Sequence, residues 1–337
     1  MSGRGTTDTG QRLMNTITDG DIDRDDFARV AEPFRRELVA YGYRMLGSVD
    51  DAEEIVQDIY LEAWRAYERF EARSSVRTWL YRIATRAFVK AVARRNRRPL
   101  PSDLNTPAVN PGAVASTASL EVAWLQPAPD SLLAGTLEDP AAVVVARQTM
   151  RLAFVAAMQV LPPRQRAVLI LRDVLQWRSS EVASLLDVSV AAVNSALQRA
   201  RARLPADHNT LVEPSEPRQR ALLDRYVAAF ERADVETLVA VLTEDAVFEM
   251  PPLSVWFRGS AVIGTFLAAR MRELGRALVV RTSANGQPAV ALYMATRGGE
   301  CRLHALHVLT VVPEGVSRVV AYLDPNALRC FNLPIRR

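Results

Sequence analysis

Cysteine and histidine are scarce in this sequence, which limits the chemistry that its side chains can support. The 337 residues include only Cys301 and Cys330, together with three histidines. Two cysteines cannot build a disulfide framework or a paired metal motif. We therefore predict no metal site and no cofactor, and such low cysteine usage fits a reducing cytoplasm.

Long apolar runs are also absent. No stretch of about 18 consecutive apolar residues occurs, so the sequence predicts no membrane span. The opening MSGRGTTDTG has no apolar segment of the kind that a signal peptide requires. Residues 1–25 are polar and rich in glycine and threonine, which predicts a disordered tail.

Lysine is almost missing, and arginine carries the positive charge. Lys90 is the only lysine, and the net charge is +4. From Ala72 to Ser102 there are nine basic residues and no acidic one, whereas Pro99 to Ala146 contains neither lysine nor arginine. Positive charge this local is typical of a binding face. Arginine suits contacts with phosphates and base edges, although a GC-rich genome also produces an arginine-rich protein.

Changes of composition divide the chain into segments. Two helix-patterned segments flank one that holds seven prolines, and a mixed pattern of helices and strands follows. We predict a multidomain protein with two all-α domains and a C-terminal α+β domain. The predicted boundaries are a tail at 1–25, a helical domain at 26–98, a proline-rich linker at 99–140, a second helical domain at 141–204, a shorter linker at 205–217 and the α+β domain at 218–337.

One part of the proline-rich linker, WLQPAPDSLL, is too apolar for a free tether. Its apolar side chains are Trp124, Leu125, Leu132 and Leu133. Burial of such side chains is favourable, so we expect this segment to pack on a folded domain.

Residues 179–203 have the pattern of a helix-turn-helix. SSEVASLL predicts a short helix, Asp187 to Ser189 a turn, and VAAVNSALQRAR a second helix. The shared core is predicted at Val188, Val193 and Leu197. Small polar residues and arginine on the outer face let a helix lie close to the major groove and read base edges. The alternative is a helical hairpin in a larger bundle, without DNA.

A second basic segment precedes the linker. Arg82, Arg86, Lys90 and Arg94 recur every four residues and so line one face of a helix. The interleaved aromatic residues are Trp79, Tyr81 and Phe88. Basic residues neutralise phosphates and aromatic rings stack on exposed bases, which suits single-stranded or melting nucleic acid. In the alternative interpretation, the aromatic rings are core and the charges a solvated stripe.

Taken together, these segments resemble the extracytoplasmic-function (ECF) sigma factors of bacterial RNA polymerase. DAEEIVQDIYLEAWRAYERF is similar to region 2.2, which meets the polymerase clamp helices, and RSSVRTWLYRIATRAFVKAVARR to regions 2.3 and 2.4, which melt and read the −10 element. LPPRQRAVLILRDVLQWRSSEVASLLDVSVAAVNSALQRARARL is similar to region 4, which reads the −35 element. The resemblance implies core polymerase and promoter DNA as partners, and an anti-sigma protein as a further one.

The resemblance assigns residues to each contact. The residues expected at the −35 element are Ser189, Ala191, Asn194, Ser195, Gln198, Arg199, Arg201 and Arg203. Those expected to read or melt the −10 element are Arg73, Arg77, Trp79, Arg82, Arg86, Lys90 and Arg94. Those expected to contact core polymerase are Asp51, Glu54, Gln57 and Asp58, although acids early in a helix also need no partner.

Two positions depart from the family pattern. Arg86 stands where the family often has Asn, and Lys90 where it often has Asp. Both changes add positive charge, so we expect phosphate contact to weigh more at the −10 element of this protein.

The segment from 218 to 331 resembles the SnoaL-like, ketosteroid isomerase-like cone fold. LLDRYVAAFERADVETLVAVLTEDAVFEMPP and WFRGSAVIGTFL support this resemblance, with the strands that follow. It implies that the domain modulates sigma activity by touching the sigma domains. Related cone folds are enzymes with a carboxylate or histidine in an apolar cavity. Here the candidate cavity residues are Tyr226, Asp245, Trp256 and Phe266, and the other titratable candidates are Glu249, His304, His307 and Asp324.

The catalytic signal in this domain is weak. His304 and His307 lie three apart on one predicted strand, so without a bulge they point to opposite faces. We predict no enzyme activity and a sigma factor modulated by its third domain. The alternatives are a helix-turn-helix repressor with an effector-binding domain, which leaves residues 48–98 unexplained, and an enzyme with a DNA-binding appendage.

Overall fold

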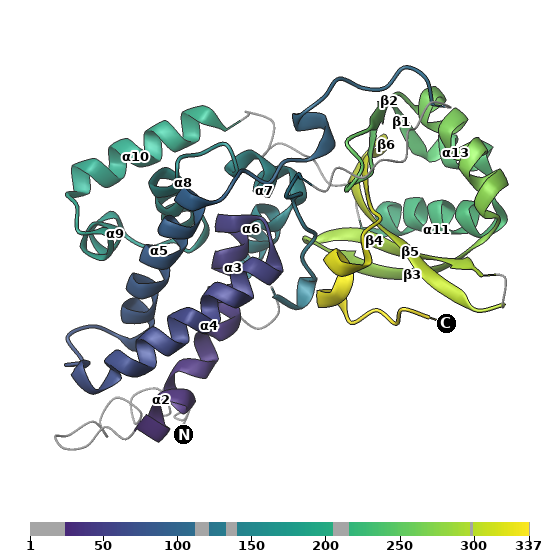
Figure 1. Cartoon of the computed structure of the whole chain (residues 1–337). Helices are drawn as coiled ribbons and strands as arrows, with labels where there is room; N and C mark the ends of the chain where they lie inside the picture. Colours follow the sequence, from purple (N-terminus) through teal and green to yellow (C-terminus); the bar gives the residue numbers. More distant parts are fainter. Residues whose placement is uncertain (1–23, 112–120, 133–139, 205–215, 297–298, 337) are drawn as a thin grey trace, which may run out of the picture.

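The computed structural model describes residues 24–111, 121–132, 140–204, 216–296 and 299–336. Almost all of the tail predicted at 1–25, most of the linker at 205–217 and Leu133 lie outside the described residues. Figure 1 shows a helical half and a sheet-containing half, joined by the proline-rich linker.

The first helical domain contains four helices, α2 (Arg24–Ala31), α3 (Arg35–Leu46), α4 (Val49–Ala66) and α5 (Val76–Arg94). Pro33 lies in the 3-10 turn η1 (Glu32–Phe34), which separates α2 from α3. The Ser48 hydroxyl accepts the Asp51 N–H at 3.1 Å and caps α4. Ile55 and Ile59 of α4 are buried, as their spacing predicts.

The second helical domain is built from α6 (Pro140–Met150), α7 (Leu152–Met158), α8 (Pro163–Leu169), the π-helix η5 (Ile170–Val174), α9 (Ser179–Leu186) and α10 (Val190–Arg203). The predicted helix-turn-helix is present as α9 and α10. Asp187 ends α9 in the left-handed conformation, with a φ of 56°. Val193 and Leu197 are buried, but Val188 is 37% exposed, so its assignment to the core was wrong. The left-handed Asp187 directs the chain outward at this point.

The C-terminal domain combines helices with one sheet. Its elements are α11 (Glu216–Arg232), α12 (Val235–Val241), β1 (Leu242–Glu249), β2 (Trp256–Arg258), α13 (Ser260–Leu274), β3 (Ala277–Ala284), β4 (Gln287–Ala295), β5 (Cys301–Val312), β6 (Gly315–Tyr322) and the 3-10 helix η7 (Pro325–Phe331). The strand order is β2-β1-β6-β5-β4-β3. Neighbouring strands are antiparallel except β1 and β6, which pair in parallel. The chain makes this pairing by crossing over through β2, α13 and the strands β3 to β5.

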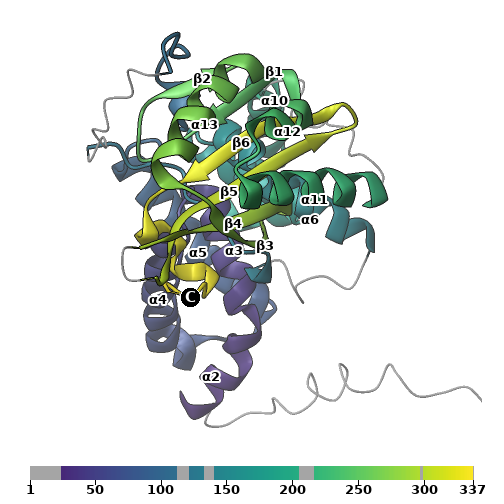
Figure 2. The same cartoon turned by 90° about the vertical axis from the view of Figure 1, so that its right-hand side faces the viewer.

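The two faces of the sheet have different neighbours. Helices α11, α12 and α13 cover one face, as Figure 2 shows, and the helical half of the molecule lies against the other (Figure 1). Side chains alternate between the faces. Accordingly, Leu292 packs in the core beneath α11 and α13, whereas Ala291 and Tyr293 pack in the same continuous core as the sigma-like helices.

The proline-rich linker contacts both halves. Trp124 is 9% and Leu125 0% exposed, which confirms the predicted docking of WLQPAPDSLL. The Gln126 N–H donates to the Gly47 carbonyl at 2.9 Å, at the end of α3. Further toward the N-terminus, the Ala108 N–H donates to the Trp256 carbonyl at 2.8 Å, beside the short edge strand β2.

The β3–β4 turn contacts both helical domains and the linker. The Asn285 side-chain nitrogen donates to the Tyr43 hydroxyl and to the Met150 carbonyl, both at 2.7 Å. Its side-chain oxygen accepts the Ala128 N–H at 2.8 Å. Asn285 is fully buried and has a φ of 58°, a conformation that asparagine and glycine tolerate best. Each donor and acceptor of this buried amide side chain therefore contacts a different part of the chain.

No single helix in the described ranges is long and apolar enough to cross a membrane, and only the bent pair of α9 and α10 passes that test jointly.

Candidate nucleic-acid interface

The outer face of α10 carries the residues predicted to read DNA. Ala191, Asn194, Gln198, Arg199 and Arg203 are exposed. Ser195 is half-buried, and Ser189 caps the helix by accepting the Ala192 N–H at 3.1 Å. Two of these side chains contact neighbours, because Asn194 pairs with Ser179 of α9 and Arg199 with Ser195. The face is small, polar and basic, which suits a major groove.

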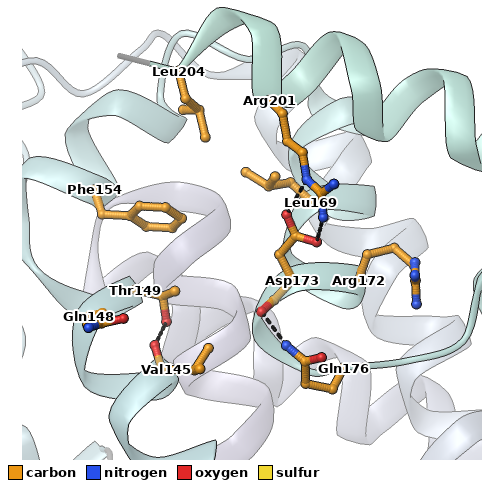
Figure 3. Close-up of a pocket in the computed structure, with 10 residues that line it drawn as sticks. All are labelled: Val145, Gln148, Thr149, Phe154, Leu169, Arg172, Asp173, Gln176, Arg201 and Leu204. Atoms are coloured by element: carbon orange, nitrogen blue, oxygen red, sulfur yellow. Dashed lines mark hydrogen bonds and ion pairs between the residues drawn. The ribbon is translucent and has the colours of Figure 1, made fainter. Parts of the chain in front are cut away.

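Arg201 differs from the other predicted phosphate contacts. Asp173, in the π-helix η5, accepts from its Nε at 2.9 Å and from its Nη2 at 2.7 Å. These hydrogen bonds raise the pKa of Arg201. Figure 3 shows the pair at the wall of a hollow of about 710 Å³ between α6, α8 with η5, and the end of α10. Phe154 and Leu204 also line this hollow. To contact a phosphate, Arg201 must therefore break its ion pair with Asp173 or bind both groups at once.

Helix α5 presents the second basic face. Arg86, Lys90 and Arg94 are exposed, and Arg82 is half-buried. Arg73, before the helix, is exposed and pairs with Glu71 at 2.5 Å. The charges stand four residues apart and so lie on one side of the helix, as the spacing predicts.

Arg77, at the start of α5, is half-buried and turns toward neighbouring helices rather than joining this face. It forms an ion pair with Glu37 of α3, and its guanidinium stacks over Tyr81 at 5.3 Å and Trp177 at 5.5 Å. Burial opposes its charge, but Glu37 more than offsets this and the pKa of Arg77 is raised. Trp177 belongs to the second helical domain, so Arg77 contributes to the contact between the two helical domains. The sequence alone does not show this contact.

The aromatic residues of α5 are mostly core. Tyr81 and Phe88 are 0% exposed, so neither is available to stack on a base in this arrangement. Trp79 is half-buried and packs on Phe70 with ring centroids 4.9 Å apart. Packing thus accounts for the aromatic pattern, because Tyr81 and Phe88 lie on the side of α5 that contacts Tyr41 of α3.

The acidic residues predicted to contact polymerase lie on α4. Glu54, Gln57 and Asp58 are exposed. Asp51 is only 18% exposed and binds Arg95 at 2.5 Å and Arg98 at 2.7 Å, so its charge is compensated within the domain. The neighbouring apolar residues Leu61 and Trp64, which the sequence pattern left unassigned, are 53% and 39% exposed. Their positions outside the buried stripe of Ile55 and Ile59, on an acidic helix, are the sequence signal that marks them.

The C-terminal domain encloses a separate cavity of about 190 Å³. Phe266 lines it, and Tyr226 lies behind it with its hydroxyl 2.8 Å from the Nδ1 of His307. Tyr226, Asp245 and Trp256 are not among its lining residues, so of the four residues assigned to the cavity only Phe266 lines it. Asp245 is exposed and accepts from the Thr243 hydroxyl at 3.1 Å, and the Trp256 indole donates to the Asn105 carbonyl in the linker at 2.8 Å.

Both histidines of β5 line this cavity. The register between β4 and β5 shifts between Leu292 and Tyr293, which leaves His304 as the extra residue of a bulge. The bulge is the condition under which His304 and His307 can share a face. Burial lowers the pKa of His307 to about 3, and burial together with Arg270 lowers that of His304.

Two other titratable candidates have structural partners. Glu249 is fully buried and accepts the Ser102 N–H of the linker at 2.9 Å and an Arg318 N–H at 3.2 Å. Asp324 caps η7 by accepting the Asn326 N–H at 2.9 Å. Within the described ranges, no group of three or more histidine, cysteine or acidic residues could hold a metal ion.

Comparison with known proteins agrees with this geometry. Residues 30–98 match the model of sigma-70 region 2, residues 151–204 that of sigma-70 region 4, and residues 223–321 that of the SnoaL-like domain. The ECF RNA polymerase sigma factor SigG of Mycobacterium tuberculosis is 46% identical over 318 residues, which cover 92% of this chain and 85% of that protein.

A second relative carries the same fold. The sigma factor SigJ of Mycobacterium tuberculosis is 27% identical over 255 residues, which cover 73% of this chain and 74% of that protein. The crystal structure of SigJ superposes with a TM-score of 0.61 at 22% identity, covering 93% of this chain and all of that one. With two sigma-70 regions, a SnoaL-like domain and this degree of identity, the chain belongs to the family of ECF RNA polymerase sigma factors.

Proposed function

We propose that this sigma factor binds core RNA polymerase in the cytoplasm and directs it to promoters with a −35 and a −10 element. Helix α10 reads the −35 element, the basic face of α5 contacts the −10 element during melting, and α4 contacts the polymerase. The domains act as sigma region 2 at 26–98 and sigma region 4 at 141–204. The polymerase performs the chemistry, and the C-terminal domain has no catalytic role.

The contact between the two sigma regions supports a closed, inactive arrangement. Trp177 of region 4 packs on Tyr81 of α5 with ring centroids 5.0 Å apart. Arg166 of α8 is buried and donates to the Met45 carbonyl of α3. By their names, the two promoter elements are centred about 25 base pairs apart, roughly 85 Å along the duplex at ~3.4 Å per base pair. Regions packed directly on each other cannot reach both elements, so the contact must open for initiation.

The C-terminal domain modulates activity by holding the two sigma regions together. Asn285 supports this proposal, because its single side chain hydrogen-bonds to Tyr43 in region 2, Met150 at the entry to region 4 and Ala128 in the linker. Each of these buried groups costs about 1–3 kcal/mol of free energy if it loses its hydrogen-bond partner and stays buried. Closure therefore requires this turn in place.

The test is runoff transcription by core polymerase with the full chain and with Asn285→Gly. Glycine tolerates the positive φ, so this variant removes the side-chain hydrogen bonds without backbone strain. We expect transcription to rise by about tenfold, the effect of roughly 1.4 kcal/mol. The matched control is Asn332→Gly, because Asn332 also has a positive φ, 51°, and is exposed.

Three outcomes would contradict the proposal. Equal transcription by Asn285→Gly and Asn332→Gly would remove the modulating role of the turn. Lower transcription by Asn285→Gly alone would mean that the contact activates rather than restrains. Failure of the full chain and both variants to bind core polymerase in a pull-down would instead favour a helix-turn-helix repressor.

A further inference from the structure

The cavity in the C-terminal domain has a polar mouth and an apolar interior. Leu274 at the end of α13 is 38% exposed, and the Arg270 side chain one turn earlier is equally exposed. Deeper lining residues such as Phe248 and Leu292 are 3% exposed. This gradient matches a ligand with one charged end near solvent and an apolar body inside.

The charge at the mouth is positive. Arg270 lines the cavity with its guanidinium group, and its Nε is buried without a hydrogen-bond partner among the described residues. Its Nη2 pairs with Glu273, which is 60% exposed on the outer side. His304 lines the same mouth and has an imidazole to donate or accept a hydrogen bond. An arginine N–H without a partner, beside an imidazole, suits a carboxylate, which accepts charge-assisted hydrogen bonds.

The inner end of the cavity offers no second charge. His307 is buried among Phe230 and Phe248, whose rings lie 5.3 and 5.7 Å from its own, and its Nδ1 faces the Tyr226 hydroxyl. Burial keeps this imidazole neutral at physiological pH. The interior therefore suits an uncharged hydrocarbon or aromatic group.

The volume sets the size of the ligand. A cavity of about 190 Å³ is smaller than those that hold drug-sized molecules, which occupy ~300–1,000 Å³. It equals about six water volumes at ~30 Å³ each. A ring or a short alkyl chain with one carboxylate fits that space.

We propose that the cavity binds a small apolar monocarboxylate, with its carboxylate on Arg270 and His304 and its apolar body against Phe248, Phe266 and Leu292. The site lies on the face of the sheet opposite the sigma regions, and binding requires neither polymerase nor DNA. The proposal is thus independent of the proposed sigma function and can fail without it.

The test is titration calorimetry of the full chain with sodium benzoate and sodium hexanoate. The neutral probes of matched shape are benzyl alcohol and hexan-1-ol. We expect at least one acid to bind below 1 mM and at least tenfold more tightly than its alcohol, the effect of one charged hydrogen-bonded contact.

The variants locate the carboxylate. Arg270→Gln should weaken acid binding at least tenfold and leave alcohol binding unchanged, whereas Arg270→Lys should retain part of the affinity. The control is Arg272→Gln on the same helix, since Arg272 is exposed and its Nε donates to the Ala268 carbonyl. Absence of acid binding at 10 mM, equal binding of acid and alcohol, or an Arg270→Gln variant that binds like the parent would each overturn the proposal.

Discussion

The two helices proposed to face DNA, α10 and α5, differ in how much of their surface the protein itself uses. Helix α10 presents its outer face to solvent, and the contacts made by that face are polar, such as Asn194 with Ser179. Helix α5 is exposed only along Arg86, Lys90 and Arg94, while its first turns pack against region 4 through Arg77 and Tyr81. In this structure, the helix proposed to read the −35 element is therefore open, and the helix proposed to contact the −10 element is partly covered.

This difference indicates where restraint acts. A substitution on α10 should weaken promoter binding in the parent and in the Asn285→Gly variant alike. A substitution on the covered side of α5 should have its full effect only after the closed contact opens.

Arg199→Ala should produce the largest loss. Arg199 is exposed on the outer face of α10, where a contact with a base edge is worth about 1–3 kcal/mol, or roughly 5- to 150-fold in specific affinity. Fluorescence anisotropy with promoter and scrambled duplexes measures this loss. Arg203→Ala is the control, because a phosphate contact weakens binding to both duplexes equally. Equal losses for the two variants on both duplexes would refute base reading by Arg199.

Arg86→Gln combined with Lys90→Gln should change the salt dependence of DNA binding. Loss of two phosphate contacts lowers the slope of log affinity against log salt by about 1.4–1.8, depending on whether the strand is single or double. Because both residues are exposed, the change in slope should be similar in the parent and in the Asn285→Gly background. Binding titrations between about 50 and 200 mM salt measure the slope. Over this range the expected change in slope amounts to roughly a tenfold change in affinity. An unchanged slope in both backgrounds would exclude α5 from phosphate contact.

Glu37→Gln should loosen the covered end of α5. The Glu37 side chain is 14% exposed and pairs with Arg77, so its neutralisation should lower the free energy of unfolding by about 1–2 kcal/mol. Urea denaturation followed by circular dichroism gives this value. Glu71→Gln is the control, since its partner Arg73 is 85% exposed and such pairs are worth about 0–1 kcal/mol. Similar effects for both variants would show that Arg77 is not a structural contact.

Asp173→Asn should have the smallest effect. It releases Arg201, whose side chain is 60% exposed, from a surface ion pair worth about 0–1 kcal/mol. We expect affinity for DNA of any sequence to rise by up to about fivefold. Anisotropy with a scrambled duplex measures the gain, and Asp187→Asn provides a control at an exposed acid in the turn before α10. A loss of affinity would mean that Asp173 positions Arg201 for DNA.

Local patterns predicted much of the fold, because they act within one or two helical turns. Ser48 is visible as a cap and Ile55 with Ile59 as a buried stripe, and both signals need only neighbouring residues. The burial of the WLQPAPDSLL segment followed from its apolar content. What the sequence did not show depends on distant partners.

The candidate site illustrates this limit. In the sequence, Arg77 and Arg201 look like the other basic residues of their helices. In the structure, they form ion pairs with Glu37 and Asp173, which are distant in sequence. Asp245 has the residue type of a catalytic base, but its strand position directs it outward. The bulge at His304 depends on the pairing of β4 with β5, which no local pattern encodes.

The sheet of the C-terminal domain has one consequence for energetics. Leu292 and Tyr293 are adjacent on β4, yet the first faces the cavity and the second the sigma regions. Suppose that a molecule in the cavity stabilises either the closed or the open arrangement of the sigma regions. The two equilibria, binding and opening, are then coupled. If the bound molecule changes the equilibrium constant for opening by some factor, opening changes the affinity of the cavity for that molecule by the same factor. Promoter engagement can then be measured from the cavity side, as a change in the dissociation constant of a small molecule.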